Sequence, residues 1–303
     1  MAEVLAAHAI PEPVPAPPRR PATSESRTAE VARRFWRNRK AALGAVLLGV
    51  MVGAALLSPL VSPYPPTRPS PEDIFSPPGP RHWMGTDEIG RDVFSRVLAG
   101  SRISLVAGLA ASALTLTAGV VFGLLSGYRG GWIDTVIMRA VDVMLAVPTL
   151  LFALAIAAAL GSALSNVVLA VGIASVPRFT RFVRGCVISA RENVYVEAAR
   201  AGGCSEARVA VRHILPNIYG PALILGTLNV GVAILTAATL SFLGMGAQPP
   251  TPEWGLILAQ GRDYLQNAWW ISTFPGVAIA LTVLAVNLFG DGLHDALDPR
   301  LRL

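Results

Sequence analysis

The chain has 303 residues, of which 53% are hydrophobic and only 15% are charged. This composition is too apolar for a soluble domain of that length, so it indicates that a membrane is the protein's solvent. The net charge of +6 does not indicate nucleic-acid binding, because the arginines flank apolar segments instead of forming one basic surface with interleaved aromatic residues.

Residues 1–40 are expected to form a largely disordered cytoplasmic tail. The first thirty residues are rich in proline and have no apolar core of the kind found in signal peptides. The tail ends in a basic cluster made of Arg33, Arg34, Arg37, Arg39 and Lys40. Because basic residues resist translocation, this cluster predicts a cytoplasmic N-terminus.

Six stretches are long and apolar enough to cross a bilayer as helices, for which about twenty residues are needed. They are residues 41–61, 103–127, 136–160, 165–184, 216–240 and 271–290. The sequence therefore predicts an all-α polytopic membrane protein of about six transmembrane helices. It divides into a first helix at 41–61, an external loop at 62–102, a core at 103–290 and a cytoplasmic tail at 291–303.

The external loop begins with a proline-rich stretch, 63–80, which favours a stiff, extended spacer. Farther on, apolar residues such as Ile89, Val93 and Val97 recur at helical spacing with charges between them. We expect residues 87–99 to form an amphipathic helix on the outer membrane surface. A lid that packs on the helical bundle is the alternative.

Arg139 and Asp142 lie near the start of the third predicted span. Charged residues at membrane depth are often functional, so the two could belong to a gate. Their closeness to the predicted cytoplasmic face favours an ion pair at the helix end over a substrate site. Pro148 and Pro177 are predicted to kink their helices.

The connection between the fourth and fifth spans is too polar to cross the membrane, yet its residues favour helix. Asn193 can cap a first helix over 194–201, and the following glycine pair can end it. Ser205 can cap a second helix that runs toward Pro216. The sequence therefore predicts a cytoplasmic elbow whose small residues allow a partner's groove to approach closely.

At this point the chain resembles the importer-type ABC permeases. Their cytoplasmic loop carries Glu-Ala-Ala, three residues, Gly, nine residues, and then an apolar residue, any residue and Leu-Pro. The matching positions here are Glu197, Ala198, Ala199, Gly203, His213, Leu215 and Pro216. His213 departs from the apolar residue of the general pattern. The peptide branch of the family often has RHILPN at this point, which residues 212–217 match.

Four further segments, 84–105, 127–148, 242–255 and 274–301, look like the C-type permease subunit of dipeptide and oligopeptide importers. This resemblance implies a type I ABC importer permease fold in the bacterial inner membrane. The implied partners are a second permease subunit, two cytoplasmic ATPase subunits and an external peptide-binding protein. A permease for nickel, glutathione or an opine-type solute is the alternative within the group.

The resemblance also assigns roles to residues. Coupling to the ATPases would fall to a loop at 193–213 and its flank, with Glu197, Ala198, Ala199, Gly203, Arg212 and Pro216. Contact with the binding protein would involve Pro249, Pro250 and Trp254, for which an interfacial anchor without a partner is the alternative.

No cofactor is expected on this chain; ATP and Mg²⁺ would be bound by the partner ATPases. A phosphate-binding loop needs a lysine before Ser or Thr, and the only lysine, Lys40, lies between Arg39 and Ala41. The four histidines and the cysteines Cys186 and Cys204 have no metal-ligand or catalytic spacing, so an enzyme is not predicted. A secondary transporter lacks support because no paired intramembrane carboxylates are evident. An ion channel lacks support because the sequence has no filter-like loop.

Overall fold

The computed structural model describes residues 27–297. The expectations for residues 1–26 and for the last part of the C-terminal tail therefore lie outside the described residues. Between residues 27 and 297 the chain is helical, and an isolated bridge between Thr86 and Asp92 is its only β-type pairing.

The α-helices follow one another along the chain with short connections, apart from the loop at 62–92. They are α1 (Arg27–Arg37), α2 (Arg39–Val61), α3 (Val93–Arg129), α4 (Gly131–Leu145), α5 (Thr149–Leu160), α6 (Leu164–Arg191), α7 (Val194–Ala201), α8 (Glu206–Arg208), α9 (Leu215–Phe242), α10 (Trp254–Gly261) and α11 (Trp270–Leu297). Short 3₁₀ turns lie at Pro71–Asp73 and Arg262–Tyr264, and a π-helical turn, η2, covers Val209–Ile214.

Five of these helices are long and apolar enough to cross a membrane, and the bent pair α4 and α5 makes up to six. The prediction of an all-α protein with about six spans is therefore confirmed. The third span is not one straight helix, because α4 and α5 meet at an angle of 92°. Pro148 stands directly before α5, where its lack of an N–H and its fixed φ interrupt the helix.

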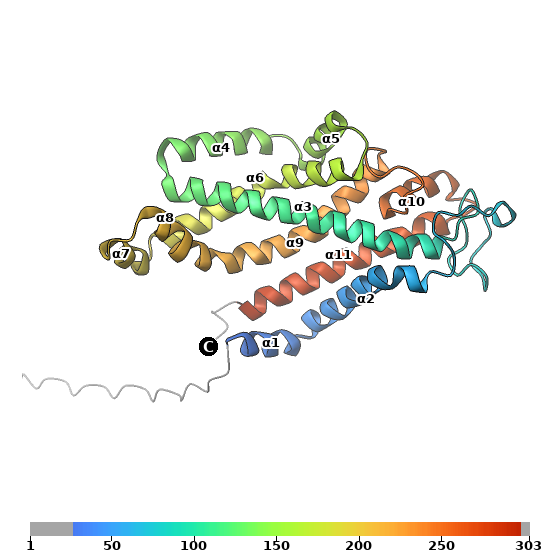
Figure 1. Ribbon diagram of the computed structural model, residues 1–303, viewed down its shortest axis with the longest axis horizontal. Coiled ribbons are helices and arrows are strands. Elements are labelled where there is room, and N and C mark those ends of the chain that lie inside the picture. The colour runs from blue at the N-terminus through green and yellow to red at the C-terminus, as the bar shows by residue number, and fades with distance from the viewer. Residues whose placement is uncertain (1–26, 298–303) are drawn as a thin grey trace, which may run out of the picture.

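The long helices run side by side, and the shorter elements gather at the two ends of the bundle (Figure 1). We call the end that holds α7 and α8 the elbow end, and the end that holds residues 62–92 and α10 the loop end. Helices α3, α6 and α9 pack together, α2 packs on α11 and α3, and α4 and α5 cover the other side of α6.

Close packing of α3 on α6 depends on glycine. A Cβ added at Gly119 would come within 2.8 Å of Phe179, and one at Gly123 within 2.6 Å of Val183. Both partner side chains are almost fully buried. Small residues thus let the two helices approach closely, as is common among helices in membranes.

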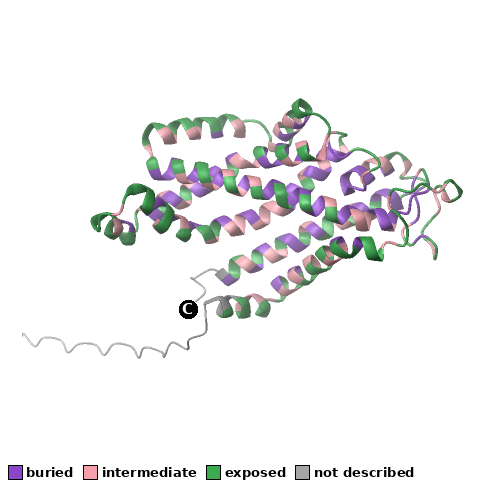
Figure 2. Cartoon of the chain, in the orientation of Figure 1, coloured by how far each residue is buried: buried purple, intermediate pink, exposed green. Residues whose placement is uncertain are grey.

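Apolar side chains are also exposed on the outside of the bundle. On α2, Leu43, Val46, Val50 and Leu57 each have more than half of their surface exposed. Figure 2 shows that exposed and half-buried residues dominate this helix. In a chain of this composition such a face suits contact with lipid.

The predicted surface helix at 87–99 is wrong. Residues 87–92 form a turn, and α3 begins only at Val93 and runs on to Arg129. The Asp92 carboxylate caps α3 by accepting a hydrogen bond from the Ser95 N–H at 2.8 Å. Val93 is fully buried, so this segment packs on the bundle. This agrees with the alternative prediction of a lid on the helical bundle.

The basic cluster of the N-terminal tail is helical, although disorder was expected for most of that tail. Residues 27–37 form α1, which packs on α11. The Phe35 and Phe289 rings lie 5.3 Å apart, and Asn38 Nδ2 donates to Asp295 at 2.9 Å. Contacts with a remote part of the chain therefore order the end of the tail.

Candidate functional site

The elbow is the segment 193–213 at the elbow end of the bundle. As predicted, it contains a helix, α7, at 194–201 that ends at a glycine pair, and Gly203 has a φ of 76°. The predicted side-chain caps by Asn193 and Ser205 are not formed. Asn193 Nδ2 instead donates to the carbonyl oxygens of Ser189 and Ala190, at 3.0 and 3.2 Å, and so fastens the end of α6.

The sequence suggested that a second short helix would follow the glycine pair. In the structure, the second half of the elbow is instead part of a longer helical segment. Helix α8 continues through the π-helical turn η2 into α9, so the helical segment from Glu206 to Phe242 is unbroken. Pro216 lies inside this segment, two residues after the end of the π-helical turn, and the chain stays helical on both sides of it. A displacement of the elbow would therefore be carried along α9 toward the loop end.

Helix α7 is anchored by one face and exposed on the other. Val196 is fully buried and packs in a cluster with Val209, Ile214 and Val187. Burial of a valine side chain contributes about 1.5–3 kcal/mol. The outward face carries Val194, which is 79% exposed. The structure thus holds α7 in place while leaving an apolar surface available for contact.

The residues singled out from the sequence lie on or near this outward surface. Glu197, Ala198, Arg212 and Pro216 are exposed, and Ala199 is half-buried against the cluster. Among the described residues, the Glu197 carboxylate has no ion-pair or hydrogen-bond partner. Its charge acts on Arg200, three residues farther along α7, and its exposed side also allows contact with a cation of another subunit.

A polar brace that sequence reasoning missed joins the elbow to α3. The Tyr128 hydroxyl donates a hydrogen bond to the Glu206 carboxylate, and Arg200 Nη2 lies 3.7 Å from the same carboxylate. The guanidinium groups of Arg191 and Arg200 each lie 5.9 Å from the centre of the Tyr128 ring. No local pattern reveals this brace, because Tyr128 and Glu206 are far apart in the sequence.

Arg139 and Asp142 do not pair with each other. Asp142 forms an ion pair with Arg181 of α6, and both side chains are about half exposed. Nearer the start of α4, Arg184 Nε lies 2.6 Å from the Asp134 carboxylate. The predicted helix-end pair within α4 is thus wrong, and two ion pairs connect α4 to α6 instead.

At the loop end, the predicted surface role of Trp254 is wrong. Its side chain is 1% exposed, and its indole N–H donates to the Val97 carbonyl at 2.8 Å. Trp254 begins α10, which packs against α9 and α11. Of the three residues predicted to contact a binding protein, only Pro249 and Pro250 are exposed.

Charged residues at the loop end form a buried cluster, although sequence reasoning placed such charges on a solvent-facing side. Arg96 and Arg91 both pair with Asp87, and the Arg91–Asp87 distance is 2.7 Å. All three side chains are almost completely buried. Arg96 also donates to Gln260 of α10 at 2.8 Å. The cluster therefore joins the 62–92 loop, α3 and α10.

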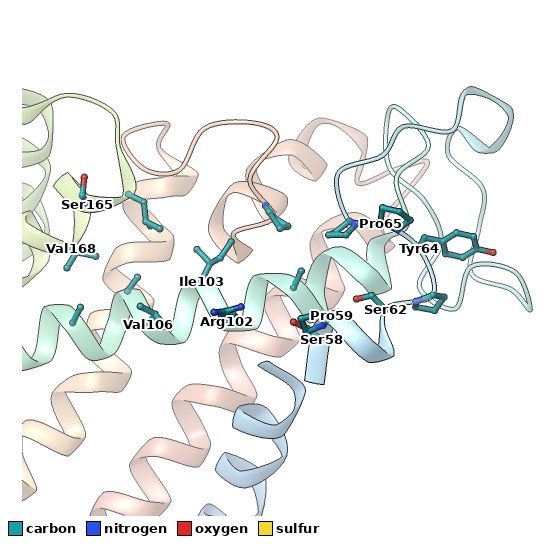
Figure 3. Close-up of a pocket in the computed structure, with 17 residues that line it drawn as sticks. Ser58, Pro59, Ser62, Tyr64, Pro65, Arg102, Ile103, Val106, Ser165 and Val168 are labelled. Carbon is teal, nitrogen blue, oxygen red and sulfur yellow. The ribbon is translucent and has the colours of Figure 1, made fainter. Parts of the chain in front are cut away.

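A cavity of about 1000 Å³ opens between the end of α2, the first turns of α3 and the start of α6. Figure 3 shows Arg102 of α3, Ser58 of α2 and Ser165 of α6 around it, with apolar side chains such as Ile103. Its lining is mostly apolar, with Arg102 as its one charged side chain among the residues that line it.

Glu253 is the buried N-cap of α10. Its carboxylate accepts hydrogen bonds from the N–H groups of Gly255 and Leu256, at 3.0 and 2.9 Å. Burial raises the pKa of Glu253 above its ordinary value, although these hydrogen bonds oppose that shift. Folding therefore takes up a proton here, and the free energy of unfolding falls as the pH rises through the raised pKa.

We expect acidification from neutral pH toward the ordinary pKa of a glutamate, about 4.3, to raise the thermal midpoint of the purified protein relative to a Glu253→Gln variant, whose side chain does not titrate. The measurement is the difference between the two midpoints at several pH values, in one detergent. A difference that stays constant with pH would contradict the shift.

Comparison with known proteins identifies two matching families. Residues 119–303 match the family described as binding-protein-dependent transport system inner membrane component, and residues 26–78 match the N-terminal transmembrane domain of oligopeptide transport permease C.

Individual relatives cover nearly the whole chain. The dipeptide transport system permease protein of Alkalihalophilus pseudofirmus is 42% identical over 292 residues, which is 96% of each chain. A putative peptide transport system permease protein of Brucella abortus is 46% identical over 90% of this chain and 92% of its own. The glutathione transport system permease protein of Pectobacterium atrosepticum is 43% identical over 90% of this chain and 91% of its own.

Proposed function

The chain belongs to the family of binding-protein-dependent transport system inner membrane components, and on that premise we propose that it is a permease subunit of an ATP-driven importer of di- or oligopeptides. The observation that carries the proposal is the elbow, a helix anchored by one face that presents Glu197 and apolar residues outward. A surface of that kind suits docking into a groove of another subunit.

The proposed assembly places this multi-pass chain in the bacterial inner membrane beside a second, homologous permease subunit. Two cytoplasmic ATPase subunits would bind and hydrolyse ATP with Mg²⁺, and an external binding protein would deliver the peptide. The elbow end lies in the cytoplasm, because Arg191, Arg200, Arg208 and Arg212 gather there and basic residues resist translocation.

In this mechanism, closure of the ATPases moves α7, and the movement passes through two connections. One is the unbroken helix from Glu206 to Phe242, and the other is the brace between Tyr128 and Glu206. Both lead from the elbow into long helices that reach the loop end, where Pro249 and Pro250 are exposed to a binding protein. The chain would thereby change which side of the membrane its half of the pore faces.

Import of glutathione is the second candidate, since a relative named for that substrate is 43% identical. The same permease architecture is compatible with import of peptides and with import of glutathione. Binding measurements with the external binding protein, using dipeptides, tripeptides and glutathione, distinguish the two.

The assembly is tested by purifying the tagged chain from its native membrane in mild detergent and identifying the bound proteins by mass spectrometry. We expect a second permease and ATPase subunits to be recovered, and ATP hydrolysis by the complex to rise when peptide-loaded binding protein is added. Recovery of this chain alone, even after crosslinking, would contradict the proposal and favour a channel or a secondary transporter.

A further inference from the structure

A group of charged side chains lies on the exposed surface of α4 and α6, inside the membrane-spanning part of the chain. We call it the charged face; it consists of Arg139, Asp142, Arg178 and Arg181, all exposed. Three arginines and one aspartate give this face a net charge of +2. Neither the elbow nor the loop-end cluster includes these residues.

Arg178 is the member of this face farthest from the helix ends. It lies 14 residues after Leu164 and 13 before Arg191, the two ends of α6. At a rise of about 1.5 Å per residue, its Cα is about 20 Å from each end of α6 and, because the predicted span ends at residue 184, about 9 Å inside the cytoplasmic end of that span. Arg181 is neutralised by Asp142, whereas Arg178 makes no ion pair or hydrogen bond with any described residue.

A charged side chain at such a depth does not remain in contact with lipid. Ionisable groups within membrane spans pair with one another or face a water-filled cavity, because the hydrocarbon solvates them poorly. The exposed face of α2 shows the contrast, since Leu43, Val46 and Val50 make it apolar. The exposed face of α2 thus suits lipid, whereas the charged face adds four ionisable groups to exposed apolar residues such as Val136 and Val143 of α4.

The charged face lies beyond the bend between α4 and α5, where α4 runs over α6. Near the loop end, α5 covers α6 with buried small residues that include Ala153 and Ala157. Beyond the 92° bend, α4 places only Val141 in a buried position and is connected to α6 by its ion pairs. Figure 1 shows α4 running along the outside of the bundle over that half of α6. The exposed surface of α6 there carries Arg178 and Arg181 beside Phe182, which is 39% exposed.

We propose that the charged face lines the aqueous translocation pathway, and that Arg178 pairs with the C-terminal carboxylate of the peptide in transit. A guanidinium matches a carboxylate with two parallel hydrogen bonds. The C-terminal carboxylate is common to all unmodified peptides, so an arginine that binds it serves an importer of many sequences. This assignment rests on the proposed function, in which the transported solute is a peptide.

Uptake of paired substrates tests the role of Arg178. The assembled importer is reconstituted in proteoliposomes and given saturating binding protein loaded with a tripeptide or with its C-terminal amide. We expect Arg178→Gln to lower uptake of the free acid about tenfold, since hydrogen bonds to charged groups are the stronger ones. Uptake of the amide should change less than twofold, and Arg178→Lys should restore most of the free-acid uptake.

Arg39→Gln, a change at an exposed arginine at the start of α2, is the matched control and should leave both substrates unaffected. An equal loss for the two substrates in Arg178→Gln would show a structural role and overturn the proposal, as would no loss for either. Failure of the unmodified importer to transport either substrate would instead count against the proposed function.

Water access is measured separately, with cysteine chemistry. In a background carrying Cys186→Ser and Cys204→Ser, Arg178→Cys is treated with a membrane-impermeant methanethiosulfonate that carries a sulfonate. The control, Val50→Cys, lies at the middle of α2 and is also exposed. We expect the cysteine at 178 to react at least about tenfold faster in the assembled importer, because thiolates form in water and not in lipid. Equal protection at both positions would overturn the assignment to the pathway.

Discussion

Replacing Gly203 by valine is expected to reduce peptide uptake by the assembled importer at least tenfold, while the chain remains in the membrane. Gly203 has a φ of 76°, a conformation that is a pronounced outlier for a β-branched residue. For residues other than glycine this region costs about 1–2 kcal/mol, and a barrier change of about 1.4 kcal/mol is tenfold in rate. The space around the residue does not add to this cost at Cβ, because no heavy atom lies within 4 Å of the Cβ position.

The matched control for this change is Gly203→Asn. Asparagine enters the left-handed region readily, so the elbow should keep its shape and uptake should stay close to that of the unmodified protein. Uptake and ATP hydrolysis are measured together on the same preparations. In the valine variant we expect hydrolysis to become independent of loaded binding protein. Full, coupled uptake by that variant would show that the bend at Gly203 does not transmit the ATPase movement.

The largest expected effect on stability comes from the buried cluster at the loop end. Asp87→Asn keeps the shape of the side chain but removes the negative charge shared by Arg91 and Arg96. Removing one partner of a buried ion pair costs about 3–5 kcal/mol, because the remaining charge stays buried without compensation. Arg91 keeps its ion pair with Glu88 at 2.9 Å, so the uncompensated charge in this variant is that of Arg96. We therefore expect a large fall in the thermal midpoint of the protein in detergent.

The control for Asp87→Asn is Asp263→Asn. Asp263 pairs with Arg262 at 3.3 Å, but both side chains are mostly exposed to solvent. Exposed ion pairs contribute about 0–1 kcal/mol, so this variant should unfold close to the unmodified protein. Similar midpoints for the two variants would mean that the loop-end cluster does not hold the 62–92 segment on α3 and α10.

The two predictions concern opposite ends of one connected set of helices. At the elbow end, the brace and the unbroken segment from Glu206 to Phe242 connect the elbow to α3 and α9. At the loop end, the charged cluster and the buried Trp254 fix α10 and the start of α3.

The sequence by itself determined the features that depend on contiguous residues. A span is recognised by about twenty apolar residues in a row, because unpaired backbone groups cannot be left in lipid. The elbow is recognised in the same way, since the glycine pair after 194–201 ends a helix through its own backbone freedom. The spans and α7 were therefore found where the sequence predicted them.

Only the tertiary structure decided which charged and aromatic side chains are buried and what they pair with. Asp87 and Arg96 alternate with apolar residues as a solvent-facing side would, yet α10 covers them and supplies Gln260. Trp254 follows a proline-rich stretch typical of surfaces, yet it packs under α3. The partner of Tyr128, Glu206, lies in another element. These contacts join residues that are remote along the chain, and their energy depends on the mutual position of helices that no local pattern specifies.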